Sequence, residues 1–282
     1  MKNISDSSII LCGIVRNAEK GLKKNIPVIS CFLEGFKDWK AYIYENDSFD
    51  NTKKILTEWS NRYPQKIVVS LNNYDSSNTI PVEKQKGNPY YSFERIEKMS
   101  FLRNKYFNYI IENDWEADYL MVVDLDVANI SLEGIMSSFE MGVEWDAVTA
   151  NGYSLSPKLR RRYHDSYALA EYGDEINPQT EEKILRLSEK YASLNPGDDP
   201  VRVFSAFGGL AIYRFDAVAG LRYSAIPNDD SRVEVRCEHF SLYKQMADRG
   251  YTRTYINPAM QIKYQRLTLK IIVNSLKRRL FK

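Results

Sequence analysis

Short apolar runs alternate with segments of helical periodicity along the first 150 residues of the chain. The run from Ile9 to Val15 is typical of a buried strand, although one glycine interrupts it. Leu22, Ile26 and Ile29 then recur at helical spacing and predict a helix. The same reasoning predicts strands at 39–44, 66–71, 119–123 and 145–149, and helices at 19–35, 51–62, 96–109 and 131–141.

Strand and helix alternation of this kind indicates an α/β fold with a doubly wound, mostly parallel central sheet flanked by helices. The pattern changes at 153–200, which is rich in Arg, Tyr, Asn, Pro and Asp, with one helix predicted near 181–193. Such a long irregular stretch favours a functional insertion. An apolar, strand-like run resumes at 203–213. We therefore expect a single domain over 1–266 that contains this insertion.

Composition narrows the class of protein. The 282 residues are 44% hydrophobic and 27% charged, as in ordinary soluble globular proteins, and the net charge of +2 gives no reason to expect a nucleic-acid partner. Cys12, Cys31 and Cys237 are too widely spaced for a disulfide framework or a zinc site, which favours a reducing compartment. The polar N-terminus lacks a signal-peptide core, and no apolar run approaches the roughly 20 residues of a membrane span. We expect a cytoplasmic protein.

Two carboxylates follow the most apolar of the predicted strands. The segment Tyr119-Leu-Met-Val-Val ends in Asp124-Leu-Asp126. Period-two geometry puts both aspartates on one face, at the carboxyl end of a strand, where open α/β sheets bind ligands. Paired oxygen donors suit Mn²⁺ or Mg²⁺, which proteins commonly share with a ligand's phosphates. A simpler reading is that the two aspartates cap the following loop and helix.

Polar residues also follow the first two predicted strands. Arg16 and Asn17 end the first one and could hold a base or ribose, although an ordinary strand-to-helix turn would look the same. Glu45 and Asp47 end the second strand, where an acidic residue often receives ribose hydroxyls. Capping of the next helix by Asp50 or Asn51 explains part of this polarity, but not both acids.

The helix before the Asp-x-Asp strand carries two arginines, Arg95 and Arg103. Their spacing puts them roughly 80° apart around the helix axis. Arg103 lies at the edge of the buried stripe, an unfavourable place for a charge without an anionic partner. It could reach a diphosphate or pair with an aspartate of the metal site. A surface arginine whose stem covers apolar residues is the alternative.

Two later motifs complete the candidate site. Gly208-Gly209 lies inside an apolar run, which suggests a bulge or a close approach of a ligand to the backbone. Cys237-Glu238-His239 precedes a short amphipathic helix that ends at Gly250. A lone histidine is more often structural, but beside Glu238 and a two-carboxylate site His239 is a candidate metal ligand.

In combination these motifs resemble the GT-A class of nucleotide-sugar glycosyltransferases. The chain looks closest to the capsule-type α-1,3-mannosyltransferase family first described in fungi, the CAP59/CMT1-like group. The resemblance covers about residues 9–250, and the chain lacks the N-terminal membrane anchor of the fungal proteins. It rests on a first strand ending Val-Arg-Asn and on the segments YENDSFDNT, RIEKMSFLRNKYF, VVDLD, FGGLAIYR and CEHFSLYKQMADRG, in that order.

The resemblance implies a role for each matching residue. Asp126 and Asp124 would hold a divalent cation on the donor diphosphate, with Asp124 nearer the ribose, and His239 would close the metal site. Arg103 would lie near the phosphates. The remaining residues expected at the nucleotide-sugar are Arg16, Asn17, Glu45, Asp47 and Arg95, with Gly208 and Gly209 lining the acceptor side.

The implied reaction moves a hexose, with mannose favoured, from a GDP- or UDP-sugar to a glycan or lipid-linked glycan in surface polysaccharide synthesis. Inversion of configuration needs a carboxylate base on the acceptor side. Glu238 is the first candidate for this base, and Asp229 and Asp230 are the next. Retention, which the resemblance implies, needs no dedicated base, because the leaving phosphate oxygen can take the proton.

Two other classes of protein share some of these features. A phosphohydrolase of the haloacid-dehalogenase type also has Asp-x-Asp, but after its first strand and followed by Thr. In this chain the pair lies mid-chain and Val127-Ala128 follows. A non-catalytic protein that binds a nucleotide-sugar or glycan would show the same binding motifs, although Glu238 and His239 together favour an active site.

The last residues, 267–282, have the composition of an interfacial helix. Leu269, Ile272 and Leu276 follow helical spacing, and basic residues crowd the same segment. We expect a basic amphipathic helix that binds an anionic surface, which would put the protein peripherally on the inner face of the plasma membrane. Packing of the apolar stripe on the domain is the alternative.

Overall fold

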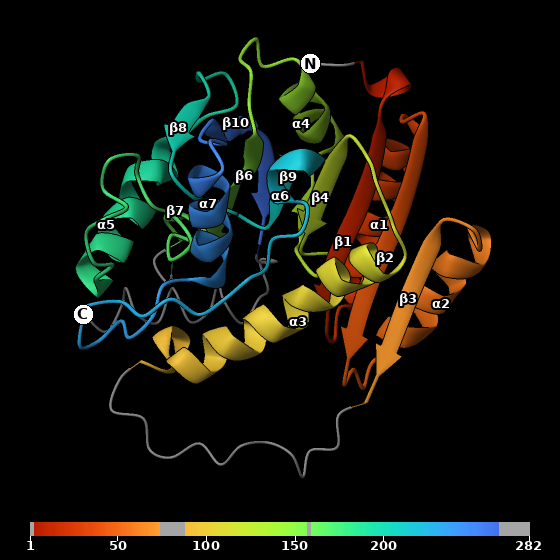
Figure 1. The fold of residues 1–282 in the computed structure, drawn as a ribbon, viewed down its shortest axis with the longest axis horizontal. Helices are drawn as coiled ribbons and strands as arrows, with labels where there is room; N and C mark the ends of the chain where they lie inside the picture. Colours follow the sequence, from red (N-terminus) through yellow and green to blue (C-terminus); the bar gives the residue numbers. More distant parts are fainter. Residues whose placement is uncertain (1–2, 74–87, 157–158, 265–282) are drawn as a thin grey trace.

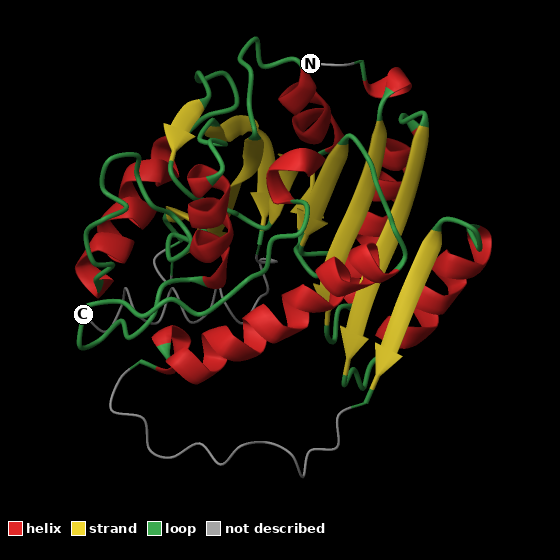
Figure 2. Cartoon of the chain, in the orientation of Figure 1, coloured by secondary structure: helices red, strands yellow, loops and turns green. Residues whose placement is uncertain are grey.

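The computed structural model describes residues 3–73, 88–156 and 159–264. These residues form a ten-stranded sheet with helices on both faces (Figures 1 and 2). The main path of the sheet has the strand order β3-β2-β1-β4-β9-β6-β10-β5, while β7 pairs with β6 and β8 with β10. The prediction of an α/β fold with a central sheet flanked by helices is confirmed.

The described strands are β1 (Ser8–Val15), β2 (Asp38–Asn46), β3 (Ile67–Asn72), β4 (Tyr119–Val123), β5 (Asn129–Ile130), β6 (Ala147–Leu155), β7 (Arg161–Tyr163), β8 (Val201–Val203), β9 (Leu210–Arg214) and β10 (Thr254–Lys263). The described α-helices are α1 (Glu19–Glu34), α2 (Thr52–Arg62), α3 (Phe93–Glu112), α4 (Leu132–Met136), α5 (Glu181–Lys190), α6 (Phe215–Val218) and α7 (Glu238–Asp248). Short 3₁₀ helices lie at Ile4–Asp6, Pro89–Tyr91, Ser137–Phe139 and Tyr191–Ser193.

Alternate side chains of the central strands feed two separate cores, because successive residues of a strand point to opposite faces. Ile9 and Leu11 of β1 pack in a cluster with apolar residues of α1, α2 and α4. The alternate residues Ile10 and Cys12 pack on the other face, in a second cluster with residues of α3, α6 and α7. In Figure 1, α3, α6 and α7 lie in front of the sheet and α1 and α2 behind it. The sheet is therefore buried on both faces, which explains the near-continuous apolar runs.

The parallel part of the sheet contains a topological switch point. From β1 the chain proceeds outward through β2 and β3, and then returns through α3 to place β4 on the other side of β1. These four strands are mutually parallel, so the carboxyl ends of β1 and β4 lie side by side. Open α/β sheets bind their ligands at such a point, outside the carboxyl ends of the strands.

The second half of the sheet is mixed. Strand β9 is antiparallel to both β4 and β6, whereas β10 is parallel to β6 and antiparallel to β5 and β8. The mostly parallel arrangement that the sequence predicts is thus found on the β3-β2-β1-β4 side. The run predicted at 203–213 is divided into the end of β8 and the strand β9, with a turn at Gly208 and Gly209 between them.

The predicted insertion at 153–200 is partly regular. It contains the end of β6, strand β7 and helix α5, which lies where the sequence predicts a helix. Tyr163, Leu187 and Tyr191 form a third apolar cluster with Val203 and Ile256 of the sheet. This packing attaches the insertion to the rest of the fold.

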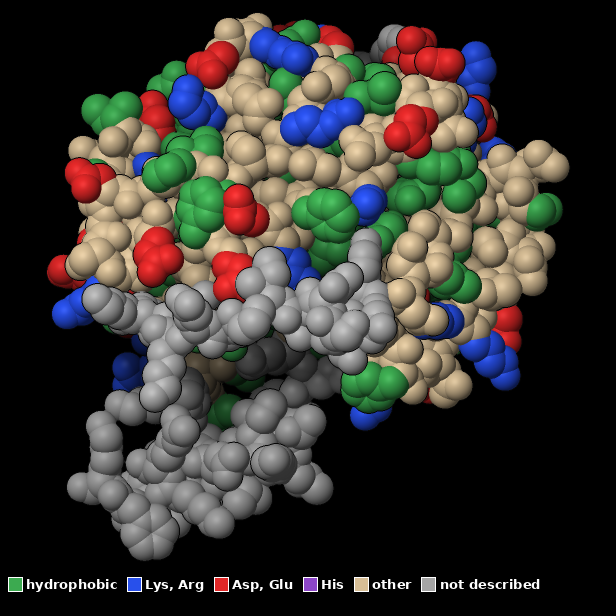
Figure 3. All heavy atoms as spheres, turned by 60° about the horizontal axis from the view of Figure 1, so that its bottom comes forward, with side chains coloured by type: hydrophobic (Ala, Val, Ile, Leu, Met, Phe, Trp, Pro, Cys, Tyr) green, Lys and Arg blue, Asp and Glu red, His purple; other side chains and the backbone are tan. Residues whose placement is uncertain are grey.

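The surface and the helices add two further observations. On the face turned forward in Figure 3, acidic and basic side chains of the described residues are interspersed. None of the helices in the described ranges is long and apolar enough to cross a bilayer. The predicted C-terminal helix at 267–282 lies outside the described residues.

Candidate active site

A cleft of about 430 Å³ lies at the switch point, at the carboxyl ends of β1, β2 and β4. Its walls come from these strand ends, from α3, from the segment after β7, from the start of α7 and from the residue after β10. The structure brings seven of the predicted site residues to it: Arg16, Arg95, Arg103, Asp124, Asp126, Glu238 and His239. Polar, aromatic or sulfur-containing side chains that the sequence analysis did not select also line it: Asn46, Lys98, Met99, His164, Asp165, Tyr167, Phe207, Cys237 and Tyr264.

Asp124 occupies the position directly after β4. Its backbone N–H donates to the carbonyl of Gly209 over 2.9 Å, which continues the pairing of β4 with β9. The hydroxyl of Tyr264 donates to one carboxylate oxygen of Asp124, and Nη2 of Arg103 lies 3.7 Å from the other. The side chain of Asp124 is only 16% exposed. It is therefore held at the base of the cleft by a hydroxyl and a guanidinium group.

The loop that carries Asp126 is fixed by helix α1. A Cβ added at Gly21 would lie 2.5 Å from the carbonyl oxygen of Leu125 and 2.6 Å from Cα of Asp126, so only glycine allows this close approach. Nδ2 of Asn25, one turn later, donates to the carbonyl oxygens of Leu125 and Val127 over 3.0 and 2.8 Å. These contacts hold the backbone on both sides of Asp126, whose side chain is exposed to the cleft.

A buried ion pair joins α3 to α7 beside Asp124. Nε of Arg103 donates to Glu238 Oε1 over 3.0 Å, and both side chains are 5% exposed. Burial lowers the pKa of Arg103, but Tyr106, Glu238 and Asp124 outweigh it and raise this pKa well above its usual value. Nη1 of Arg103 has no hydrogen-bond partner among the described residues. The guanidinium group thus keeps one donor for an anionic ligand.

His239 is almost fully buried next to this pair. Its ring stacks on Phe207 with centroids 3.9 Å apart, and Nε2 lies 3.8 Å from Glu238 Oε1. Burial, and then the charge of Arg103, lower the pKa of His239 well below its usual value, so the ring is neutral near pH 7. Neither ring nitrogen has a hydrogen-bond partner among the described residues. A neutral imidazole of this kind can serve as a ligand or as a hydrogen-bond donor.

The polar residues after β1 and β2 hold the two loops together. The backbone N–H of Asn17 donates to Ser48 Oγ over 2.9 Å, and Asn17 Oδ1 accepts from the N–H of Phe49 over 3.0 Å. Glu45 is buried and accepts from the N–H of Ser48 over 2.8 Å. Asn17 and Asp47 both have a positive φ, of 51° and 55°. Asn17, Glu45 and Asp47 therefore shape the rim beside Arg16 and Asn46, but they do not line the cleft themselves.

Gly208 and Gly209 act on the site through packing. A Cβ at Gly208 would lie 2.3 Å from the carbonyl oxygen of Ala150, and one at Gly209 would lie 2.9 Å from the ring of Tyr264. Both glycines have a positive φ, of 62° and 93°. They do not line the cleft as predicted. Gly209 leaves room for the ring of Tyr264, which reaches Asp124, and Gly208 allows the turn to lie against the backbone of Ala150.

Asp229 and Asp230 lie outside the cleft, and this corrects the prediction that either could act there as a base. Asp230 Oδ1 instead accepts from the backbone N–H groups of Arg232 and Val233 over 2.9 and 2.8 Å. The physical reason is a local turn, in which a short acidic side chain satisfies the backbone that follows it.

The carboxylates of the cleft fit a divalent cation. Burial raises the pKa of Asp124 to about 6; Arg103 and Tyr264 act against this shift, while Asp126 and Glu238 add to it. A cation beside Asp124 and Asp126 would relieve this repulsion, and carboxylate oxygens suit Mn²⁺ or Mg²⁺. No three His, Cys, Asp or Glu side chains within the described ranges form a metal-binding group. Two carboxylates suffice when phosphates and water complete the shell, so the ligand role of His239 stays a prediction.

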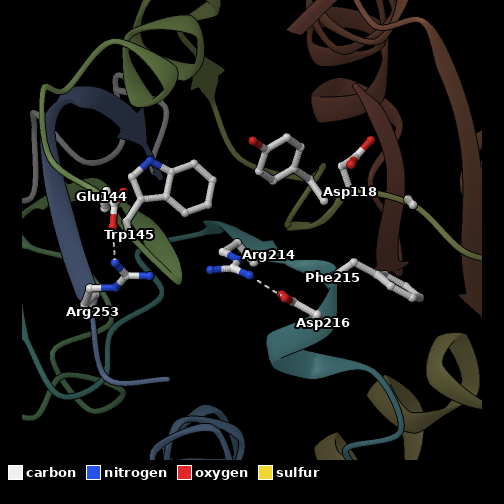
Figure 4. Close-up of a pocket in the computed structure, with 9 residues that line it drawn as sticks. Asp118, Glu144, Trp145, Arg214, Phe215, Asp216 and Arg253 are labelled. Atoms are coloured by element: carbon white, nitrogen blue, oxygen red, sulfur yellow. Dashed lines mark hydrogen bonds and ion pairs between the residues drawn. The ribbon is translucent and has the colours of Figure 1, made fainter. Parts of the chain in front are cut away.

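A second cleft, of about 480 Å³, lies at the opposite end of β4 (Figure 4). Its two arginines are already paired. Arg253 Nη2 lies 2.8 Å from Asp146 and also pairs with Glu144, while Arg214 pairs with Asp216. Because these charges neutralise one another at the amino end of the strand, this cleft lacks the available charged groups of the first one.

The chain belongs to a known family. A profile of the family described as "Cryptococcal mannosyltransferase 1" matches residues 34–243, which include the Asp-x-Asp pair and Glu238-His239. This chain is a member of the cryptococcal mannosyltransferase 1 family. The match confirms the predicted relationship to the capsular mannosyltransferase group. A comparison with curated proteins found no match.

Several solved structures match most of this chain at low sequence identity. The mannosyltransferase PcManGT from Pyrobaculum calidifontis, solved with GDP-Man and Mn²⁺, is 11% identical with a TM-score of 0.47, and the match covers 98% of this chain and 65% of that one. TarS from S. aureus (residues 1–349) is 12% identical with a TM-score of 0.43, over 96% and 64%. Glucosyl-3-phosphoglycerate synthase from Mycobacterium tuberculosis, solved with UDP, is 11% identical with a TM-score of 0.45, over 96% and 80%. The chain thus spans slightly less than two thirds of the length of the first two.

Proposed function

We propose that this member of the cryptococcal mannosyltransferase 1 family is a metal-dependent glycosyltransferase. Its donor would be a GDP- or UDP-sugar, with mannose favoured as the transferred hexose. The acceptor would be a glycan or lipid-linked glycan in surface polysaccharide synthesis. The observation that carries this proposal is the cleft at the switch point, where Asp124 and Asp126 face the arginines of α3.

The charges of the cleft fit a nucleoside diphosphate. Arg95, Lys98 and Arg103 line the α3 wall and can neutralise phosphate oxygens, and Nη1 of Arg103 lacks a partner among the described residues. Arg16 and Asn46, at the ends of β1 and β2, line the same cleft and would contact the nucleoside. Asp124 and Asp126 would hold Mn²⁺ or Mg²⁺, which when bound supplies positive charge to the leaving diphosphate.

The residues around the leaving group favour a mechanism without Glu238 as the base. One oxygen of Glu238 accepts from Arg103 Nε over 3.0 Å, and the other accepts from Sγ of Cys237 over 3.4 Å. With both oxygens engaged, this side chain is better suited to fixing Arg103 against the diphosphate than to taking a proton. We therefore propose retention of configuration, in which the departing phosphate oxygen takes the proton of the acceptor hydroxyl.

Thermal unfolding with a panel of nucleotide-sugars tests the proposed donor binding. Wild-type protein should be stabilised by GDP-mannose or a UDP-hexose only when Mn²⁺ or Mg²⁺ is present. A ligand at 100 times its dissociation constant adds about 2.7 kcal/mol to the free energy of unfolding. EDTA should remove this effect.

The matched variants are Asp126→Asn in the cleft and Asp216→Asn in the second cleft. Asp126→Asn should abolish both metal-dependent stabilisation and sugar transfer while leaving the unliganded melting temperature close to that of the wild type. Asp216→Asn should retain both. Full turnover by Asp126→Asn with Mn²⁺ present would contradict the metal assignment.

A further inference from the structure

Asp165 is a cleft carboxylate that neither the motifs nor the proposed donor site explains. It lies just after β7, in the segment at 153–200, and lines the cleft together with His164 and Tyr167. Within the described parts of the chain, its side chain forms no hydrogen bond or ion pair with another residue. By contrast, Asp124 and Glu238 each have a defined hydrogen-bond partner.

The backbone of Asp165 has a conformation that few residues other than glycine adopt, although aspartate tolerates it better than most. Its φ is +65°, in the left-handed region. Residues other than glycine that adopt such a conformation cluster at functional sites, where the surrounding structure enforces it. The position is thus maintained at a cost in free energy.

Neighbouring contacts enforce this position. The backbone N–H of His164 donates to the carbonyl of Gly152 over 2.8 Å, and the His164 ring stacks on Tyr264, which in turn contacts Asp124. On the other side, the hydroxyl of Tyr167 donates to the carbonyl of Val235. The segment around Asp165 is therefore fixed to β6, to the residue after β10 and to the loop before α7.

The charge of Asp165 limits what it can bind. Burial, followed by the charges of Glu238 and Asp124, raises its pKa to about 8, although Arg103 and Arg95 act against this shift. With this pKa the side chain is largely protonated near pH 7 in the metal-free protein, so it offers no negative charge to a cation. It needs neutral hydrogen-bond donors, and sugar hydroxyls are groups of this kind.

We propose that Asp165 is a specificity-determining residue that accepts a hydrogen bond from a sugar hydroxyl bound in this cleft. This inference rests on the proposed glycosyltransferase function. The hydroxyl belongs either to the transferred hexose of the donor or to the acceptor glycan, since both present the same chemistry. Its aromatic neighbours Tyr167 and Tyr264 provide apolar surface for the ring of such a sugar.

Two variants preserve the backbone at this position. Asn and Gly both tolerate a positive φ, so Asp165→Asn and Asp165→Gly test the carboxylate without adding strain. Circular dichroism and thermal unfolding check that each variant folds. Asp126→Asn serves as the control that removes metal-dependent donor binding.

Three measurements with Mn²⁺ distinguish the sources of the hydroxyl. Calorimetry compares the affinity for GDP with that for GDP-mannose. Release of GDP from GDP-mannose in water measures hydrolysis, and transfer is measured to the methyl mannoside, glucoside or galactoside that the wild type uses fastest. Loss of a hydrogen bond that leaves its buried partner unsatisfied corresponds to a change of about 10- to 100-fold.

A hydroxyl of the transferred hexose predicts that both variants bind GDP normally, whereas Asp165→Gly loses about 10- to 100-fold in affinity for GDP-mannose. Asp165→Asn should lose less, because its amide oxygen still accepts a hydrogen bond. An acceptor hydroxyl predicts normal affinity for both nucleotides and normal hydrolysis, with transfer to the methyl hexoside reduced by the same factor. Either result supports the proposal.

Several results would overturn it. Unchanged affinity and transfer in both variants would show that Asp165 contacts no sugar. Loss of GDP affinity would make Asp165 part of the nucleotide or metal site. If both variants bind the donor normally but lose hydrolysis and transfer to the same extent, Asp165 would act in proton transfer. If the wild-type protein hydrolyses the donor but transfers the hexose to no methyl hexoside, the affinity for GDP-mannose decides. Normal GDP-mannose affinity in both variants would then refute the hydroxyl assignment. Wild-type protein that neither binds nor cleaves the donor would refute the proposed function itself, and this role of Asp165 with it.

Discussion

The buried ion pair between Arg103 and Glu238 shows at the scale of single residues how stability and the site depend on each other. Removing one partner of such a pair leaves an uncompensated charge in a medium of low dielectric constant. Arg103→Met should therefore lower the free energy of unfolding by about 3–5 kcal/mol, as measured by urea denaturation. Adding Glu238→Gln should recover part of this loss. Equal stability of Arg103→Met and wild type would show that the pair is not formed.

The raised pKa values of Asp124 and Asp165 predict how stability depends on pH in the absence of metal. These values, about 6 and about 8, lie above those of an unfolded aspartate, so the folded state binds more protons between about pH 4 and 8. The free energy of unfolding should fall as pH rises through this range. Asp165→Asn should flatten the upper part of this decline in EDTA. An unchanged slope in the variant would contradict the burial of this carboxylate.

The candidate site could be predicted in part at this scale. Asp124, Asp126 and Arg103 stood out because each interrupts an apolar pattern, and a polar residue in such a place needs a partner or a function. Asp165 and Tyr264 have no such signal. Asp165 lies in an irregular segment rich in charged residues, and only the fold brings it beside residues far away in the sequence.

At the scale of secondary structure, the approach of α1 to the Asp-x-Asp loop depends on one glycine. Alanine in place of a helical glycine normally stabilises a helix by roughly 0.5–1 kcal/mol. At Gly21 the added methyl would overlap Leu125 and Asp126, so we predict a loss of about 1–3 kcal/mol from overpacking. Metal-dependent GDP binding, measured by calorimetry, should weaken by about 10-fold or more because the loop is displaced.

Gly197→Ala is the matched control for this substitution, since a Cβ at Gly197 meets no atom within 4 Å. It should leave both stability and nucleotide affinity unchanged. If Gly21→Ala behaves like Gly197→Ala, then α1 does not position the loop.

Elements with a clean periodicity could be predicted from the sequence, and β10 could not. The strands β1, β2 and β4 are largely buried because helices cover both of their faces. In β10 the pattern is broken at Asn257 and Pro258, where the pairing with β6 also shifts in register. Proline removes a hydrogen-bond donor and is typical of such irregularities, so the pattern hides the strand. Tyr264, which directly follows this strand, was missed for that reason.

At the scale of the whole molecule, the segment at 267–282 gives a prediction about location. Its apolar residues follow helical spacing, and its basic residues can each contribute about 1 kcal/mol near an anionic surface. The full chain should therefore sediment with anionic liposomes at low salt, and less so with neutral ones. A chain ending at Arg266 should not. Equal binding of both chains to anionic vesicles, or none by either, would contradict a membrane role for this segment. The basic residues concerned are Lys270, Lys277, Arg278, Arg279 and Lys282.

The proposed function requires that the cleft at the switch point binds a nucleotide together with a metal ion. A crystal structure with GDP and Mn²⁺, with diffraction recorded at the manganese absorption edge, tests this most directly. We predict an anomalous peak at coordination distance from Asp126, with the diphosphate between it and Arg103. A nucleotide bound elsewhere, for example beside Arg214 and Arg253, or a manganese peak away from Asp124 and Asp126, would contradict the assignment.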